Sequence, residues 1–174
     1  MKNINVKEYF ELSNKFEYDL LLVSLLAENI FDKNINEFTY LDVINLFKFA
    51  KKDLSFDNDF VLFSLFFGIE KYQFETLSVT DYFSAKKFIL NFVKTTAERQ
   101  NKLLSSVNID SDKWQMCERG RLNKFNDIMP LVQIGEIYGI YPFDLQNKLY
   151  SEILSLLVLH KTKKDVQNEF NQMK

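Results

Sequence analysis

The sequence predicts an all-α protein, a multi-helix bundle of stacked helical hairpins with about seven to eight helices. The 174 residues include only 4 Gly and 2 Pro, which leaves few sharp turns and disfavours an all-β sandwich. Apolar residues recur at helical spacing along most of the chain. The 18 Phe and 8 Tyr supply a large core. This length predicts a single domain over 1–174, with sub-units at 1–107 and 108–174.

The N-terminal part is expected to contain three helices. A short one begins near Val6, and a second over 16–31 is apolar on most sides, as a buried helix would be. Thr39 is predicted to cap the third, with Asp42 at the third helical position returning the capping bond.

The next stretch is rich in phenylalanine. Asp57 or Asp59 is expected to cap a central helix over 60–69. The following stretch, 71–79, alternates loosely and reads as a loop or one short strand.

Two similar stretches, 19–26 and 59–66, suggest an internal repeat. The alternative is that two buried helices with Asp caps resemble each other by composition alone.

The longest predicted helix covers 81–107, with Thr80 as its cap. The polar stretch after it should break the chain, and Ser111 can cap another helix that passes through Trp114 to Arg119.

The C-terminal third predicts a helix, a turn and a helix. Pro130 requires a helix to start just before it, and Gly139 is expected to end that helix in the left-handed conformation. Pro142 should begin a helix that ends at His160, where an imidazole suits the negative end of the helix dipole. Thr162 is expected to cap a final amphipathic helix.

Charge and hydropathy argue against two classes of partner. The net charge is −2 with no basic block, so nucleic-acid binding is not expected. No run approaches the length of a membrane span, so no membrane partner is expected either. Charged residues interrupt residues 1–8 before an apolar core forms, which predicts that the chain is not secreted by a signal peptide.

No set of residues predicts catalysis. His160 and Cys117 are each the only residue of their type, so no zinc pattern exists and a catalytic Cys–His pair would have to join them. A structural thiol is the preferred interpretation of Cys117. Asp57 and Asp59 lack the glycine and terminal glutamate of a calcium loop. We therefore expect no catalytic, cofactor-binding or metal-binding residue, and no enzyme.

Aromatic and arginine side chains are candidate partner contacts. Trp114 lies near Arg119 and Arg121, which could hold a carboxylate or a protein partner, or could simply form a solvated helix end. Tyr138 and Tyr141 are two further candidates, because the chain carries more aromatic surface than one core of this size needs.

The chain resembles small helical virion and assembly proteins of tailed bacteriophages. The resemblance rests on the helical, Phe-rich composition, the turn over 134–142 and the polar tail over 161–174. Ring proteins of the portal vertex, head–tail connectors and tail assembly chaperones belong to this group. The resemblance implies a structural or assembly protein without a cofactor, forming homo-oligomers or hetero-oligomeric assemblies. It would act in the host cytoplasm during assembly and in the virion.

Two other functions stay open. The first is a ligand-binding helical domain with an aromatic-lined cavity, although these rings are more simply core; it would use Phe60, Phe63, Phe67, Phe88 and Phe92. The second is a helix-turn-helix DNA-binding regulator, whose second helix has no arginine; it would offer Phe143, Asp144, Gln146, Asn147 and Lys148.

Overall fold

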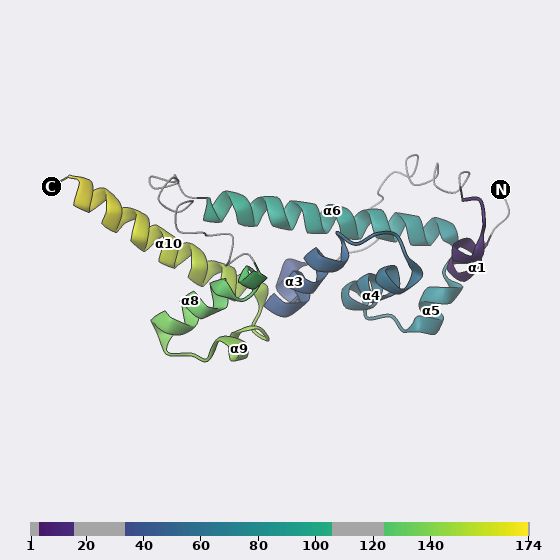
Figure 1. Cartoon of the computed structure of the whole chain (residues 1–174), viewed down its shortest axis with the longest axis horizontal. Coiled ribbons are helices and arrows are strands. Elements are labelled where there is room, and N and C mark those ends of the chain that lie inside the picture. The colour runs from purple at the N-terminus through teal and green to yellow at the C-terminus, as the bar shows by residue number, and fades with distance from the viewer. Residues whose placement is uncertain (1–3, 16–33, 106–123, 174) are drawn as a thin grey trace. The chain divides into compact units, whose positions relative to one another are not determined.

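The chain is all-α, as predicted. The computed structural model describes residues 4–15, 34–105 and 124–173, and within these it contains eight α-helices, one 3₁₀-helix and two isolated β-bridges (Figure 1). The chain forms two compact units. Unit 1 consists of Met1–Asn34 and Asp42–Thr96, and unit 2 consists of Ile35–Leu41 and Ala97–Lys174. Whether the two act as one domain stays a prediction.

Unit 1 is built from short helices and the first part of a long one. Its helices are α1 (Val6–Glu11), α3 (Tyr40–Phe49, from Asp42 on), α4 (Phe56–Phe67), α5 (Lys71–Thr76) and α6 (Val79–Leu104, up to Thr96). In Figure 1, α1, α4 and α5 lie beside the first turns of α6.

Aromatic rings form the core of unit 1. The Phe63 ring stacks on Tyr82 with centroids 5.4 Å apart, and Phe74 meets Phe63 edge to face at 5.1 Å. Tyr9 of α1 meets Phe83 of α6 at 5.2 Å. These contacts join α1, α4, α5 and α6. Their offset and edge-to-face geometries are the ones that aromatic pairs prefer.

Unit 2 has its own core. Its elements are η1 (Ile35–Glu37), the start of α3, the last turns of α6, α8 (Met129–Tyr138), α9 (Pro142–Leu145) and α10 (Tyr150–Gln172). The ring of Tyr40 stacks on Tyr150 at 6.2 Å. The apolar side chains buried here are Phe38, Tyr40, Leu131, Ile134, Leu145, Tyr150, Ile153 and Leu157.

The two units share one local plan. In unit 1, α4 ends at left-handed Gly68, the short α5 follows, and α6 begins at Val79. In unit 2, α8 ends at left-handed Gly139, the short α9 follows, and α10 begins at Tyr150. Each feature of unit 2 comes 71 residues after its counterpart in unit 1, from Gly68 to Gly139 and from Val79 to Tyr150.

Backbone pairing repeats in the same register. An antiparallel bridge joins Asn5 to Ser78 in unit 1, and another joins Thr39 to Leu149 in unit 2. Ser78 and Leu149 are again 71 residues apart. The buried positions follow the same shift, since Phe63, Phe74 and Tyr82 correspond to Ile134, Leu145 and Ile153. The chain therefore uses one helical plan twice.

Several expectations are confirmed. The short helix begins at Val6, with Asn5 and Glu8 forming a capping box at 2.9 and 3.0 Å. The helix expected to follow Thr39 begins at Tyr40. The helix at Pro130 begins one residue earlier, and Gly139 ends it with φ +66°.

Three expectations in unit 1 are wrong. The cap of α4 is Ser55, whose hydroxyl accepts the Asn58 N–H at 3.2 Å, so Asp57 and Asp59 lie inside the first turn. The stretch expected as loop or strand contains α5, because the buried Phe74 holds it against the core.

The start of α6 is the third correction. The helix begins at Val79, and Ser78 rather than Thr80 accepts the Asp81 N–H at 3.1 Å. The sequence offers both hydroxyls, and the bridge to Asn5 fixes which one precedes the helix.

The C-terminal helices also differ from expectation. The helix begun by Pro142 stops after Leu145, and α10 starts afresh at Tyr150. No new helix starts at Thr162, whose hydroxyl donates to the Val158 carbonyl at 2.9 Å inside α10. His160 accordingly lies within α10 and not at its end.

Some expectations fall outside the described residues. These are the helix over 16–31, the stretch 19–26 that was compared with 59–66 as an internal repeat, the helix after Ser111, and the residues Trp114, Cys117, Arg119 and Arg121. Among the helices that the structure describes, none has both the length and the apolar character needed to cross a bilayer.

The buried tyrosines of unit 2 predict an alkaline transition. The Tyr150 hydroxyl donates to Gln100 Oε1 at 2.7 Å, and burial raises its pKa to about 12, partly opposed by Arg99. Burial, reinforced by Tyr150, also raises the pKa of Tyr40 well above 10.0. A group whose pKa is higher in the folded state than in the unfolded state stabilises the fold. Its contribution is fully present at pH values below the unfolded-state pKa. The contribution of these two tyrosines to the free energy of unfolding should therefore be fully present below pH 10.0 and be lost as pH rises through about 12.

Urea unfolding measured across this pH range checks the prediction. Tyr150→Phe should flatten part of the decline, because one of the two ionisations is removed. Tyr72→Phe, at an exposed tyrosine of α5, should leave the decline unchanged. Equal slopes for the protein and Tyr150→Phe would contradict the assignment.

Candidate functional site

An exposed apolar surface follows the end of α8. We call it the α8–α9 patch; its residues are Ile137, Tyr138, Ile140, Tyr141 and Phe143. Each is between 41% and 64% exposed, and five large apolar side chains fall within seven consecutive residues. The rings of Tyr141 and Phe143 contact each other with centroids 5.5 Å apart. Exposed apolar side chains gathered along one short segment mark a candidate contact site, whereas scattered single ones do not.

The backbone holds this patch in a tight turn. Gly139 adopts φ +66°, which only glycine takes without strain, and ends α8. The Ile140 N–H then donates to the Gly135 carbonyl at 3.1 Å. Pro142 fixes the backbone at the first position of α9. The patch is thus presented by a turn with defined geometry.

Gly135 allows the turn to close onto α8. A Cβ at this position would lie 2.5 Å from the Ile140 carbonyl oxygen and 3.1 Å from Pro142 Cγ. Gly135→Ala should therefore lower the free energy of unfolding by about 1–3 kcal/mol, the usual cost of overpacking. Urea denaturation measures this. Gln133→Ala on the exposed side of α8 is the control and should change stability little. A neutral Gly135→Ala would mean that the turn shifts without cost.

The patch lies in an acidic stretch of the chain. From Phe125 to Asn147 the sequence contains three carboxylates and no lysine or arginine. Two of the carboxylates, Glu136 and Asp144, are exposed within or next to the patch. A partner that covers the patch would therefore meet apolar surface with negative charge at its rim.

The structure brings together only part of the predicted contact set. Tyr138 and Tyr141 both lie in the patch, whereas Trp114, Arg119 and Arg121 lie outside the described residues. The sequence did not single out Ile137, Ile140 or Phe143 as protein contacts, although Phe143 was among the residues of the DNA-binding alternative. Their spacing fits a buried helix face equally well, so no local signal separates the exposed from the buried case.

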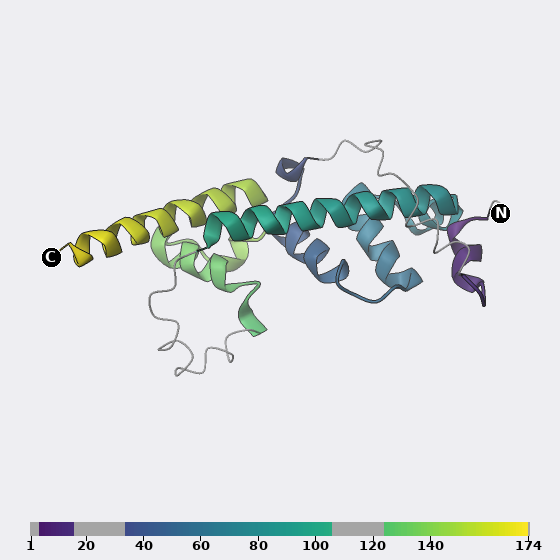
Figure 2. The ribbon, with the colours of Figure 1, turned by 90° about the horizontal axis from the view of Figure 1, so that it is seen from above.

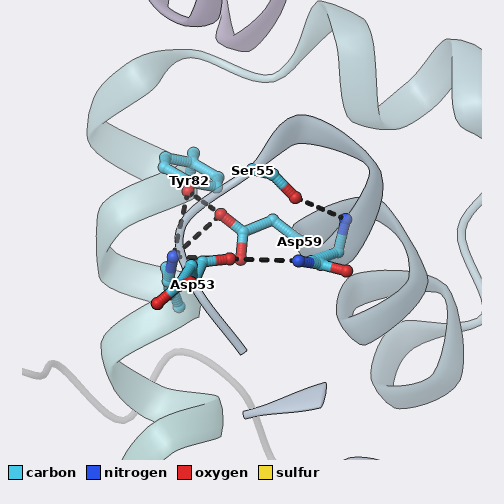
Figure 3. Close-up of polar contacts among 6 residues, drawn as sticks. Asp53, Ser55, Asp59 and Tyr82 are labelled. Carbon is cyan, nitrogen blue, oxygen red and sulfur yellow. Dashed lines mark hydrogen bonds and ion pairs between the residues drawn. The ribbon is translucent and has the colours of Figure 1, made fainter. Parts of the chain in front are cut away.

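A second cluster of chemical interest lies inside unit 1. Asp59 of α4 points toward α6, where its carboxylate accepts a short hydrogen bond from the Tyr82 hydroxyl (Figure 3). Lys86 Nζ, one turn further along α6, donates to both carboxylate oxygens at 2.8 and 3.0 Å. The Asp59 backbone N–H donates to the Ser55 carbonyl at 3.0 Å, and the Ser55 hydroxyl accepts the Asn58 N–H. The Asn58 side chain donates to the Asp53 carbonyl at 3.1 Å.

This cluster satisfies its own polar groups. Tyr82 is fully buried, Asp59 is buried, and Lys86 is mostly covered. Among the described residues, every buried side-chain nitrogen and oxygen has a hydrogen-bond partner. In the same part of the chain, no group of three His, Cys, Asp or Glu could hold a metal ion. We interpret the cluster as a buried ion pair that holds α4 against α6.

The residues of the two alternative functions are placed as follows. Of the five phenylalanines proposed to line a cavity, all have ring contacts in unit 1, and Phe63 is fully buried. In the proposed DNA-reading segment, Phe143 and Asp144 lie in α9, whereas Gln146, Asn147 and Lys148 follow its end.

Comparison with known proteins gives no assignment: no protein family, curated protein or solved structure matches the chain.

Proposed function

We propose that this chain is a non-enzymatic protein that acts through contacts with other protein chains, and that the α8–α9 patch is its contact surface. The observation that carries the proposal is the exposure of five large apolar side chains at the end of α8, in the turn that follows and at the start of α9. Tyrosine and phenylalanine are enriched at the centres of protein interfaces. Because Gly139 and Pro142 fix the turn, its backbone loses little further freedom on binding.

A more specific proposal is a component of a ring or head–tail connector in a tailed bacteriophage particle, assembled in the host cytoplasm. The resemblance of the 134–142 turn and the 161–174 tail to phage structural proteins supports it. A tail assembly chaperone is the alternative from the same group. Mass measurement of the purified protein separates the two, since a ring component forms closed assemblies of many copies and a chaperone forms small complexes with its client.

Photo-crosslinking tests the contact surface directly. Tyr141 is replaced by p-benzoylphenylalanine, the protein is expressed in the cells that make it, and adducts are identified by mass spectrometry after irradiation. We expect a defined protein adduct from position 141. The matched control carries the same amino acid at position 72, an exposed tyrosine of α5, and should give none. Equal labelling from both positions, or none from 141, would sink the proposal.

A further inference from the structure

The α8–α9 patch uses a position that is filled in unit 1. Phe66 is 1% exposed, and its ring packs against Phe88 at 5.8 Å and Phe92 at 5.0 Å. Ile137 comes 71 residues later, at the same place in the shared plan, and is 47% exposed. The position that is buried in unit 1, at Phe66, is therefore exposed to solvent in unit 2, at Ile137. Among the residues that the structure describes, no element buries Ile137 as Phe66 is buried.

A second exposed apolar surface lies on the last turns of α10. We call Val166, Phe170 and Met173 the tail stripe; they are 58%, 54% and 84% exposed. Their spacings of four and three residues place them on one side of the helix. Lys163 and Lys164 are exposed just before the stripe, and Lys161 lies beside them. Three lysines and two carboxylates, Asp165 and Glu169, give this segment a net positive charge up to residue 173.

The two surfaces are complementary. The patch is apolar in a stretch whose only charges are carboxylates, and the tail stripe is apolar in a segment with excess lysine. Opposite charge at the rim of an apolar contact favours association and orients it. An amphipathic helix that lays its apolar side on such a surface is a common mode of recognition.

The tail stripe does not meet the patch of its own chain. α10 is one unbroken helix from Tyr150 to Gln172, about 35 Å long. Its last turns extend beyond the end of α8 in both views (Figures 1 and 2). The tail stripe would have to bend back across a broken helix to reach the turn that precedes α10. Contact between the two surfaces therefore requires two chains.

We propose that the α8–α9 patch of one chain binds the tail stripe of a second copy of the same chain. This inference rests on the proposed function, and it names the partner for that surface. Because two different surfaces meet, one chain of the pair keeps its tail stripe and the other keeps its patch for the next neighbour. Such a head-to-tail contact closes into a ring where the rotation permits and otherwise continues as a filament.

Complementation between two defective variants tests the contact. The patch variant carries Ile137→Lys and Tyr141→Lys, which place positive charge opposite the lysines of the tail segment. The tail variant carries Val166→Gln and Met173→Gln, which remove its apolar contacts without adding carboxylates that the altered patch would attract. Sedimentation over a concentration series should show assemblies larger than a dimer for the unmodified protein. Each variant alone should associate about tenfold more weakly or worse, the effect of losing a central contact. An equimolar mixture should form a dimer and stop there, because only one intact patch–tail pair remains.

Circular dichroism of each variant establishes that it is folded, and the mixture itself requires both to be. Tyr72→Lys, at the unit 1 position that corresponds to Phe143, is the control and should assemble as the unmodified protein does. A monomeric unmodified protein, assembly that survives both variants, or a mixture that stays monomeric would overturn the inference. Crosslinking from position 141 to a different protein would also overturn it while leaving the proposed function intact. Absence of any adduct from 141 would remove the proposed function itself.

Discussion

Asp59→Ala is expected to lower the free energy of unfolding by about 3–5 kcal/mol, because it leaves the mostly covered Lys86 without its countercharge. Asp59 holds Lys86 through contacts of 2.8 and 3.0 Å, and it also accepts the Tyr82 hydroxyl bond. Removing the carboxylate leaves the Tyr82 hydroxyl and Lys86 Nζ without this acceptor in a site largely shielded from water. Urea denaturation followed by circular dichroism measures the change.

Replacing the whole cluster should cost much less. A buried ion pair recovers little more than the cost of desolvating its charges, so a well-packed apolar set of similar volume is often as stable. Unit 2 already carries such a set, since Ile153 and Leu157 stand 71 residues after Tyr82 and Lys86 and are buried. The triple variant Asp59→Leu, Tyr82→Phe, Lys86→Met should therefore be more stable than Asp59→Ala. A triple variant as unstable as Asp59→Ala would show that the charges themselves hold α4 against α6.

Phe74→Ala should have an effect of similar size. The side chain is fully buried and contacts Phe56, Phe63 and Tyr82 at 5.3, 5.1 and 6.0 Å. Truncation of a buried phenylalanine typically costs about 3–5 kcal/mol. Because α5 has only six residues, this ring is its main attachment to the core.

The matched control lies two residues away. Tyr72 is on the same short helix but is 73% exposed, so Tyr72→Ala should change the free energy of unfolding by about 0.5 kcal/mol or less. Both variants are compared by urea denaturation under the same conditions. Similar losses for the two would mean that α5 is stabilised by its backbone and not by the buried ring.

Features that depend on neighbours in the sequence were predictable. The shortage of glycine and proline and the helical spacing of apolar residues predict an all-α chain, which the structure confirms. Pro130 and Gly139 mark the two ends of α8, because proline favours the first turn and glycine tolerates positive φ. Tyr138 and Tyr141, selected because the chain has more aromatic surface than its core needs, are both exposed, and their contact with a partner stays a prediction.

Features that depend on pairing between residues far apart in the chain were not predictable from the sequence. α10 starts at Tyr150 because its N–H donates at 2.9 Å to the carbonyl of Phe38, more than a hundred residues earlier. The start of α6 likewise follows from the bridge between Asn5 and Ser78. Nothing near residues 146–149 predicts this break, since the apolar spacing continues through it.

The sequence by itself determined that this chain is helical, where its proline and glycine punctuate α8, and that its core is aromatic. Only the tertiary structure decided that Asp59 is buried against Lys86, that α5 is a helix, and that Ile137 is exposed while Phe66 is buried. The physical reason is that backbone conformation responds mainly to adjacent residues. Burial, in contrast, depends on which surfaces the rest of the chain brings near.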